Sequence, residues 1–421
     1  MERLYLGIEL DDSGCSMAWL NPADRKVQKL QDQTGEYRIP SYLCFDTGHN
    51  RWYAGAEAEK KQGKEGCIVL NRLITLFQSG QCLKINGSCY TDEDMFREYM
   101  NYILKEAMRR SGTEQIESLA VCMEKAEIRD AEKISRLCSG LGIDPMNIHI
   151  LNRQECFMYY LMSQKREIWS NVSLLFDYGQ KGLYCYEVSQ IKGLRPVTAQ
   201  SHMEEIKGAP SVLQLRYEEE AQNAADRWFA GLAEKKMSGK IISSVMLCGE
   251  GFEDVSWARQ FILSISSQKS RKVYQVEALY GMGAAFAAYH IADDHRNFPY
   301  RCICEGRVST TVSIFVDEHG ENEQMVLVRA GTSCYEARTS VDLNLIGQSS
   351  LNLFVRNAGA QESRSLPLDL TAFMCDGRER TKIRLSVAFS DMDSMVVRVE
   401  DLGFGEIYPS TGRVVEQHYH V

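Results

Sequence analysis

Two stretches of the chain repeat one pattern, in which a short apolar strand runs into an acidic, glycine-containing turn and an apolar strand then resumes. The first copy spans residues 4–20 and the second spans residues 174–188. The pattern predicts two β-hairpins, with Asp177 at the tip of the second. Gly179 and Gly182 would let the backbone approach an anion closely. Most hairpins of this kind are only turns, but two of them separated by a long segment indicate a phosphate held between two halves.

The segments between and after the hairpins alternate in type. Thr91 and Asp94 predict a helix cap, and Gly112 predicts the end of that helix. The other predicted strands are residues 38–46, 118–123, 148–151 and 242–248, and the other predicted helices are residues 126–140, 154–166, 210–236 and 278–288. This alternation predicts a mostly parallel sheet covered on both faces. Small residues fill the last helix, so we expect it to be buried.

The hydrophobic pattern changes near Arg301. Residues 292–300 are polar and include a proline, which is typical of a linker. From residue 301 to residue 421 the apolar positions alternate with polar ones, and the pattern predicts an antiparallel β-sandwich. The sequence therefore predicts one α/β domain over residues 1–291, a linker over 292–300 and a β-domain over 301–421.

Composition narrows the range of partners and compartments. The chain has 421 residues, of which 44% are hydrophobic and 25% are charged, and its net charge is −9. An acidic chain without a basic stripe disfavours nucleic acid and anionic membranes as partners, because both attract clustered Lys and Arg. The N-terminus shows no secretory signal pattern, and no apolar run is long enough to cross a bilayer. We expect a cytoplasmic protein.

The order of these motifs resembles that of the actin-like ATPase superfamily, which has a two-lobed, ribonuclease H-like fold. The resemblance covers nearly the whole chain and is strongest to the DnaK-type (Hsp70-like) heat-shock chaperones. Residues 7–10 look like the family's first phosphate motif and residues 176–182 like its second. Residues 245–252 look like its adenosine motif, and residues 283–285 look like its closing helix.

The resemblance implies a site for ATP or ADP with Mg²⁺. It places Glu9, Asp11 and Asp177 at the catalytic positions, with Glu9 and Asp177 as the metal ligands. The nucleotide-binding positions that it implies are Asp12, Ser13, Gly14, Gly179, Gln180, Lys181, Gly182, Gly249, Glu250, Gly251 and Phe252. The C-terminal sandwich would correspond to the family's peptide-binding β-domain, with Val316, Leu351, Leu353 and Val355 as candidates for the peptide pocket.

The chain departs from the family pattern at several of these positions. Asn71 stands where the family has its catalytic lysine, and it cannot supply that positive charge. Asp11 and Asp12 replace small polar residues, and their carboxylates repel phosphate unless a metal intervenes. We expect Lys181 to block or neutralise the phosphate pocket rather than to orient an attacking water. The upper lobe is expected to be trimmed, and the helical lid has no counterpart.

These departures favour a DnaK-like protein with a degenerate ATP site that hydrolyses ATP very slowly or not at all. Such a protein would bind polypeptide partners as a chaperone-like or regulatory module. One alternative is an active, Mg²⁺-dependent ATPase chaperone that uses Glu9, Asp11 and Asp177. A second alternative is an actin-like assembly protein, although this leaves the sandwich unexplained.

Overall fold

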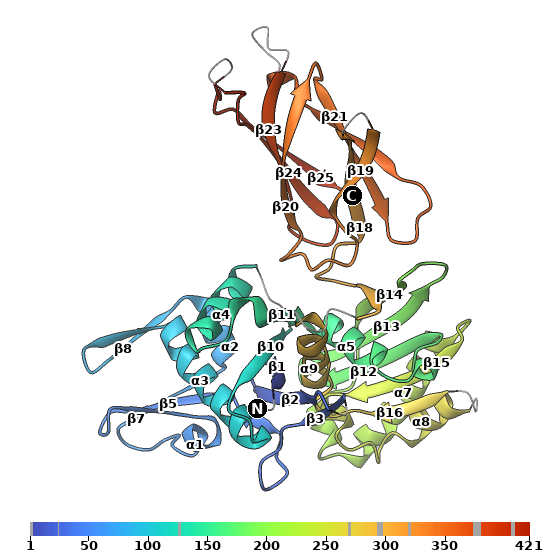
Figure 1. Ribbon diagram of the computed structural model, residues 1–421. Helices are drawn as coiled ribbons and strands as arrows, with labels where there is room; N and C mark the ends of the chain where they lie inside the picture. Colours follow the sequence, from blue (N-terminus) through green and yellow to red (C-terminus); the bar gives the residue numbers. More distant parts are fainter. Residues whose placement is uncertain are drawn as a thin grey trace. The chain divides into compact units, whose positions relative to one another are not determined.

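The chain forms two compact units in the computed structural model (Figure 1), which describes residues 3–23, 25–124, 128–267, 271–292, 298–318, 321–373, 380–405 and 409–421. The first unit comprises Met1–Ser189 and Met203–Phe298, and the second comprises Gln190–His202 and Pro299–Val421. The second unit thus takes a short segment from the middle of the chain, which the sequence does not indicate. Most of the predicted linker, residues 293–297, lies outside the described residues.

One sheet of the first unit contains the first predicted hairpin. Its strand order is β11-β10-β1-β2-β3, and β4 also pairs with β2. The strands are β1 (Leu4–Leu10), β2 (Gly14–Asn21), β3 (Lys26–Lys29), β4 (Arg38–Pro40), β10 (Ile116–Met123) and β11 (Ile148–Asn152). Strands β1 and β2 are antiparallel, whereas β1, β10 and β11 are parallel. The predicted strand 38–46 is wrong as a single element, because β4 joins this sheet and β5 (Tyr42–Asp46) joins another.

A further group of strands and helices lies between β4 and β11 in the sequence. Its elements are β6 (Arg51–Ala54), α1 (Gly55–Glu59), β7 (Cys67–Asn71), α2 (Leu73–Ser79), β8 (Cys82–Ile85), β9 (Ser88–Thr91), α3 (Asp92–Ser111) and α4 (Ile128–Gly140). Strands β6, β5 and β7 form one sheet, and β8 pairs with β9. The predicted cap of α3 is confirmed, because the backbone N–H of Asp94 donates to Thr91 Oγ1 at 3.1 Å. Gly112 ends the helix in the left-handed conformation, as predicted.

The second large sheet contains the second hairpin. Its order begins β16-β15-β12-β13-β14, with β12 (Val172–Gly179), β13 (Gly182–Ile191), β14 (Val197–Ile206), β15 (Ile242–Cys248) and β16 (Lys272–Gln275). The helices that follow β11 in the sequence are α5 (Arg153–Met162), α6 (Val212–Leu215), α7 (Glu219–Met237), α8 (Arg259–Ser266) and α9 (Leu279–Ile291). The expected single, mostly parallel sheet is therefore two mixed sheets, because each hairpin adds an antiparallel strand. The predicted helix 210–236 is two helices, since residues 216–218 separate α6 from α7.

Helix α9 packs against β1 so closely that the contact requires glycine. A Cβ atom on Gly7 of β1 would lie 2.1 Å from the backbone nitrogen of Ala285, and one on Gly283 would lie 1.9 Å from the carbonyl oxygen of Cys156 in α5. The small residues of this helix are buried, as expected from the sequence. Short side chains thus let three backbones meet at the centre of the first unit.

The second unit is an antiparallel β-sandwich, in agreement with the sequence. One sheet has the order β19-β18-β21-β22 and the other has the order β20-β23-β24-β25. The strands are β18 (Thr310–Glu318), β19 (Glu321–Val328), β20 (Arg338–Ile346), β21 (Ser350–Asn357), β22 (Arg364–Asp369), β23 (Arg380–Phe389), β24 (Ser394–Asp401) and β25 (Val414–His420). Alternate residues of both sheets form one shared apolar core. Strand β17 (Tyr300–Ile303) pairs in parallel with Val197 to Gln200 of β14.

Short 3-10 turns complete the described secondary structure at Pro145–Asn147, Arg166–Ile168, Glu250–Phe252 and Thr371–Phe373. Among the described residues, no helix has both the length and the apolar character needed to cross a membrane.

Candidate functional site

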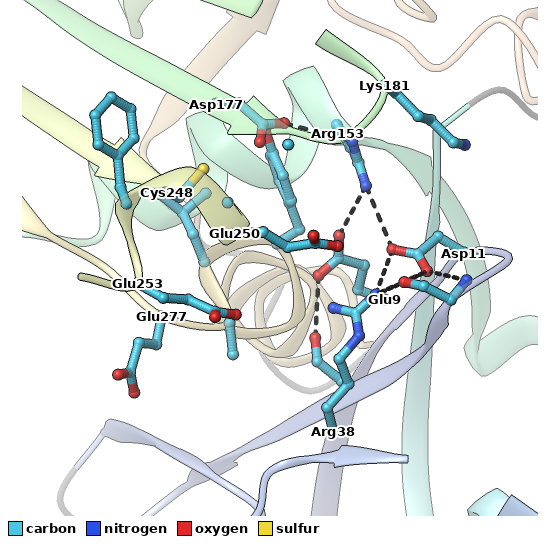
Figure 2. A pocket seen from close by; sticks show the side chains of 18 of the residues that line it. Glu9, Asp11, Arg38, Arg153, Asp177, Lys181, Cys248, Glu250, Glu253 and Glu277 are labelled. Atoms are coloured by element: carbon cyan, nitrogen blue, oxygen red, sulfur yellow. Dashed lines mark hydrogen bonds and ion pairs between the residues drawn. The ribbon is translucent and has the colours of Figure 1, made fainter. Parts of the chain in front are cut away.

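A cleft of about 380 Å³ in the first unit brings the two hairpins together (Figure 2). The turns of β1–β2 and β12–β13 line it, together with the turn after β15 and the start of α9. The predicted residues that line the cleft are Glu9, Asp11, Asp12, Ser13, Asp177, Gly179, Gln180, Lys181, Gly182, Gly249, Glu250 and Phe252. Gly14, Asn71 and Gly251 are not among the lining residues. Most of the predicted site therefore gathers at one place, from segments far apart in the sequence.

Arg153 is the central residue of the cleft, and the sequence reasoning missed it. Its guanidinium contacts Glu9 Oε1 through Nη2 at 3.2 Å and Asp177 Oδ2 through Nη1 at 3.4 Å. It also lies 5.0 Å from the ring centre of Tyr280. Figure 2 shows this arginine lying between Asp177 of the second hairpin and Glu9 of the first. One side chain thus ties the two hairpins together.

The position of Arg153 follows from local sequence. It is the first residue of α5, and Asn152 and Glu155 cap this helix reciprocally. The helix starts directly after β11, at the carboxyl edge of parallel strands, where side chains face a cleft in α/β folds. The capping pattern Asn-x-x-Glu after a buried strand was a signal that could have identified this arginine.

Burial and the neighbouring charges both act on the pKa values of Arg153 and Glu9. Burial opposes the charge of Arg153, but the carboxylates of Asp177 and Glu9 outweigh it and raise the pKa of the guanidinium well above its usual value. Burial also raises the pKa of Glu9, and this effect exceeds the opposing attraction of Arg153. Ser16 Oγ donates to Glu9 Oε2 at 3.0 Å, and the Tyr280 hydroxyl donates to Asp177 Oδ2 at 2.6 Å. Both carboxylates are therefore held by donors from the protein.

A second arginine holds the tip of the first hairpin. Arg38 Nη2 lies 2.6 Å from Asp11 Oδ2, and Ser13 Oγ donates to Asp11 Oδ1 at 2.6 Å. Burial alone would raise the pKa of Asp11, but the charge and hydrogen bond of Arg38 lower it to about 2. Asp12 accepts from the backbone and the hydroxyl of Thr75 in α2. Both acidic side chains are thus bound by hydrogen-bond donors of the protein itself.

The region expected to carry the catalytic lysine contributes an arginine instead. Asn71 is exposed at the end of β7. Arg72 follows it in the left-handed conformation, with φ of 53°. Its side chain lines the cleft and lies 3.9 Å from Asp12 Oδ2. Arg72 therefore supplies a positive charge next to Asn71, where the sequence predicted that the catalytic lysine is lost. This arginine is exposed, however, and already paired with Asp12.

The cations that line the cleft form ion pairs with carboxylates of the protein itself. Lys181 Nζ contacts Glu124 Oε2 at 2.5 Å, outside the cleft lining. Gln180 donates to Glu250 at 2.8 Å, which Arg216 also approaches. The lining includes seven carboxylates, Glu9, Asp11, Asp12, Asp177, Glu250, Glu253 and Glu277, and four cations, Arg38, Arg72, Arg153 and Lys181. Such a lining repels a polyphosphate.

The donor set also fits Mg²⁺ poorly. Magnesium requires oxygen ligands in near-ideal octahedral geometry. Glu9 and Asp177, the predicted ligands, share the guanidinium of Arg153 instead. Within the described part of the chain, no group of three or more His, Cys, Asp or Glu side chains is placed to hold a metal ion. The positive charge between the two carboxylates comes from the protein.

The glycines of the predicted adenosine motif serve tight packing. A Cβ atom on Gly249 would lie 2.5 Å from the carbonyl oxygen of Tyr178, and one on Gly251 would lie 2.2 Å from Tyr178 Cδ1. Gly249 also has a positive φ of 91°. By contrast, no described atom lies within 4 Å of a Cβ placed on Gly179 or Gly182. Only the hairpin glycines thus leave open space at the cleft.

Two of the four predicted peptide-binding residues are part of the sandwich core. Leu353 and Val355 are buried among the apolar residues of both sheets. Val316 and Leu351 are partly buried and pack against that core. The last two are therefore the only members of the predicted set with surface for a peptide.

The protein thus has two units. The first is an α/β unit in which Arg153 connects the two hairpins of the cleft, and the second is a β-sandwich. The chain belongs to the family of unknown function DUF5716, whose C-terminal model matches residues 26–305. Residues 307–421 match the domain of unknown function DUF8552. No curated protein matches the chain.

Proposed function

We propose that this protein is a DnaK-like member of the actin-like ATPase class whose ATP site is degenerate. In this proposal it binds polypeptide partners, as a chaperone-like or regulatory module, without hydrolysing ATP. The observation that carries the proposal is the guanidinium of Arg153, which contacts both Glu9 and Asp177. Arg153 thereby neutralises the two carboxylates that an ATPase of this class would use to bind its metal ion.

The internal repetition of the first unit supports the assignment of the class. Each large sheet has an antiparallel hairpin followed by parallel strands, namely β1–β2 with β10 and β11, and β12–β13 with β15 and β16. Helices α5 and α9 pack against each other. A cleft between two such halves, with an acidic residue at each hairpin, is the arrangement expected of the actin-like class.

The charges of the cleft support the absence of hydrolysis. Phosphoryl transfer depends on positive charge placed where negative charge develops. Arg38 binds Asp11, Arg153 binds Glu9 and Asp177, and Lys181 binds Glu124. Transferring Arg153 to a phosphate would leave Glu9 and Asp177 buried without their cation, and transferring Arg38 would remove the nearer of the two arginines at Asp11. The energetic cost of that exchange opposes both binding and catalysis.

The test is phosphate release from ATP by the full chain with Mg²⁺, compared with Asp177→Ala and with Glu234→Ala. Glu234 is an exposed carboxylate on α7 outside the cleft, so it controls for the loss of one negative charge. We expect all three proteins to give background turnover. Turnover in the parent and in Glu234→Ala that disappears in Asp177→Ala would identify an active ATPase and overturn the proposal.

The sandwich supports the choice of a polypeptide partner. Strands β19, β20, β22 and β25 lie at the ends of the two described sheets, where backbone groups can pair with an extended peptide. Pro367 lies within β22 and cannot donate to such a peptide, which favours the other edges. Binding of the full chain to an array of extended apolar peptides tests this half of the proposal. A Val316→Ser variant should bind more weakly, and binding to no peptide would contradict it.

A further inference from the structure

A second, smaller pocket of about 220 Å³ lies entirely within the second unit. It is built on one face of the β19-β18-β21-β22 sheet. Val312 and Ile314 of β18 are buried in the sandwich core, so Thr311 and Ser313 of the same strand face the opposite way. Both of these hydroxyl residues line the pocket. The pocket is thus an outer-face feature, separate from the apolar core.

Four arginines from four separate segments surround this pocket. Arg195 comes from the connection between β13 and β14, Arg301 from β17, Arg329 from the residue directly after β19 and Arg356 from β21. Among the residues that the structure describes, no Asp or Glu lines the pocket. Within the part of the chain that the structure describes, none of these four side chains forms an ion pair with a carboxylate. This contrasts with the cleft of the first unit, where every lining arginine is paired.

Three of the four arginines, Arg301, Arg329 and Arg356, are close enough to repel one another. Burial lowers the pKa of Arg301, and the charges of Arg329 and Arg356 lower it further. Like charges gathered without a counter-ion cost free energy in the folded protein. An arrangement of this kind is stable when an anion neutralises it, and binding sites are where proteins place such groups.

The backbone and the floor of the pocket are shaped to hold these groups. A Cβ atom on Gly331 would lie 2.6 Å from Cγ of Arg301, and Gly331 has a positive φ of 86°. Gln324 Nε2 donates to Ser313 Oγ at 2.8 Å. Thr311 Oγ1 accepts from the backbone of Ala330 at 3.1 Å, which leaves its hydroxyl hydrogen for an acceptor. A glycine makes room for one arginine, and a hydroxyl donor lies among the guanidinium groups.

We propose that this pocket binds a phosphate group, either as inorganic phosphate or as part of a phosphomonoester. Guanidinium groups bind phosphate oxygens in bidentate pairs, and Arg recognises such planar, forked geometry better than Lys. The volume of about 220 Å³ suits one phosphate group with a short stem. A confined pocket differs from the extended basic stripe that a nucleic acid requires. This site does not depend on the proposed function of the first unit.

The experiment uses the full chain and two probes, inorganic phosphate and a short peptide that contains O-phosphoserine. Calorimetry should detect binding of at least one probe, and the affinity should fall as the sodium chloride concentration rises. Tighter binding of the peptide would identify a phosphorylated polypeptide as the source of the group. Tighter binding of inorganic phosphate would identify a free or small-molecule phosphate. Binding of neither probe would overturn the proposal.

Variants connect the binding to the arginines. Arg301→Gln and Arg356→Gln should each weaken the affinity roughly tenfold or more, because each removes a charge-assisted contact. Arg398→Gln is the matched control, since Arg398 is an exposed arginine of β24 in the same unit and outside the pocket. Equal affinities for the parent, Arg356→Gln and Arg398→Gln would overturn the proposal.

Thermal unfolding gives a second readout that does not depend on measuring affinity. Without phosphate, Arg356→Gln should unfold at the same or a higher temperature than the parent, because it relieves repulsion among the arginines. With phosphate, the unfolding temperature of the parent should rise and that of Arg356→Gln should change much less. An equal rise in both proteins would assign the effect to non-specific salt stabilisation and would contradict the site.

Discussion

A single buried cation, Arg153, pairs with the two central carboxylates of the first unit's cleft. Arg153 is only 16% exposed at its side chain and contacts two carboxylates that are 10% and 8% exposed. Removing one member of a buried ionic group leaves its partners without compensation. The arrangement is therefore structural as well as electrostatic, and its loss should be visible in stability.

We predict that Arg153→Met lowers the free energy of unfolding by about 3 kcal/mol, because Glu9 and Asp177 then remain buried without a counter-charge. Chemical denaturation measures the effect. Arg136→Met is the matched control: Arg136 is an exposed residue of α4 that pairs with Glu93 at 3.0 Å. An exposed pair of this kind contributes at most about 1 kcal/mol. Similar losses in the two variants would show that Arg153 has no special structural weight.

The carboxylate of Asp11 makes stability depend on pH at the acid end. Its pKa falls from an ordinary value of 3.8 to about 2 in the folded protein, although burial alone would raise it, because Arg38 and Ser13 bind the ionised form. The resulting stabilisation is complete above about pH 4 and is lost as the pH falls through about 2, with a size of about 2 kcal/mol.

The comparison of Asp11→Asn with the parent tests this assignment. The variant should be less stable at neutral pH, and the difference should shrink between about pH 4 and pH 2. Glu362→Gln, which alters an exposed carboxylate of the second unit, should follow the parent throughout. A constant difference between Asp11→Asn and the parent across this range would rule out the ion pair as its cause.

At the scale of elements, the fit of α9 between β1 and α5 controls the stability of the first unit. Gly283→Ala would bring a Cβ atom to 1.9 Å from the backbone of Cys156, and that backbone cannot rotate away. We predict a loss of about 2–3 kcal/mol in the free energy of unfolding. Thermal or chemical unfolding of the full chain measures it.

Gly231→Ala is the matched control for this prediction. Gly231 also lies inside a helix, α7, but apart from its neighbours in that helix no described atom would lie within 4 Å of its Cβ. The same substitution should therefore stabilise the protein by about 0.5–1 kcal/mol through helix propensity. A loss in both variants would mean that the close approach of α9 is not the cause.

The elements that sequence predicted well are those with local signals. Thr91, Asp94 and Gly112 fix both ends of α3 through contacts with their neighbours in sequence. The predicted strand 38–46 was wrong as a single element because β4 pairs with β2 whereas β5 pairs with β6 and β7, and hydrophobic alternation alone does not reveal which strands pair. The gathering of hairpin residues at one cleft was predictable from the repeated motif.

The ion pairs of the cleft were not predictable in the same way. Arg153 lies 144 residues from Glu9 in sequence and 24 from Asp177, and its role depends on the approach of two sheets. The arginine pocket of the second unit is similar, because its four members come from four segments. The capping pattern around Arg153 could have placed this residue at the start of a helix beside the cleft, but the residue spacing does not identify its distant partners.

At the scale of the whole molecule, the cations that line the cleft of the first unit are paired with carboxylates, whereas the arginines of the second unit's pocket are not. The cleft between the hairpins therefore resists anions, whereas the pocket on the sandwich attracts them. The two units differ in this respect although the chain as a whole is acidic, with a net charge of −9. Net charge alone would have excluded an anionic ligand that the local arrangement favours.

The inclusion of Gln190–His202 in the second unit has a consequence for the order in which the molecule is completed. Val197 to Gln200 pair with Tyr300 to Ile303, which leave the ribosome roughly a hundred residues later. At roughly 5–20 residues per second, this partner strand follows after about 5–20 seconds. The arginine pocket needs Arg195 from before this interval and Arg356 from after it. The pocket can therefore be complete only after residue 356 has been synthesised and β17 has paired with β14.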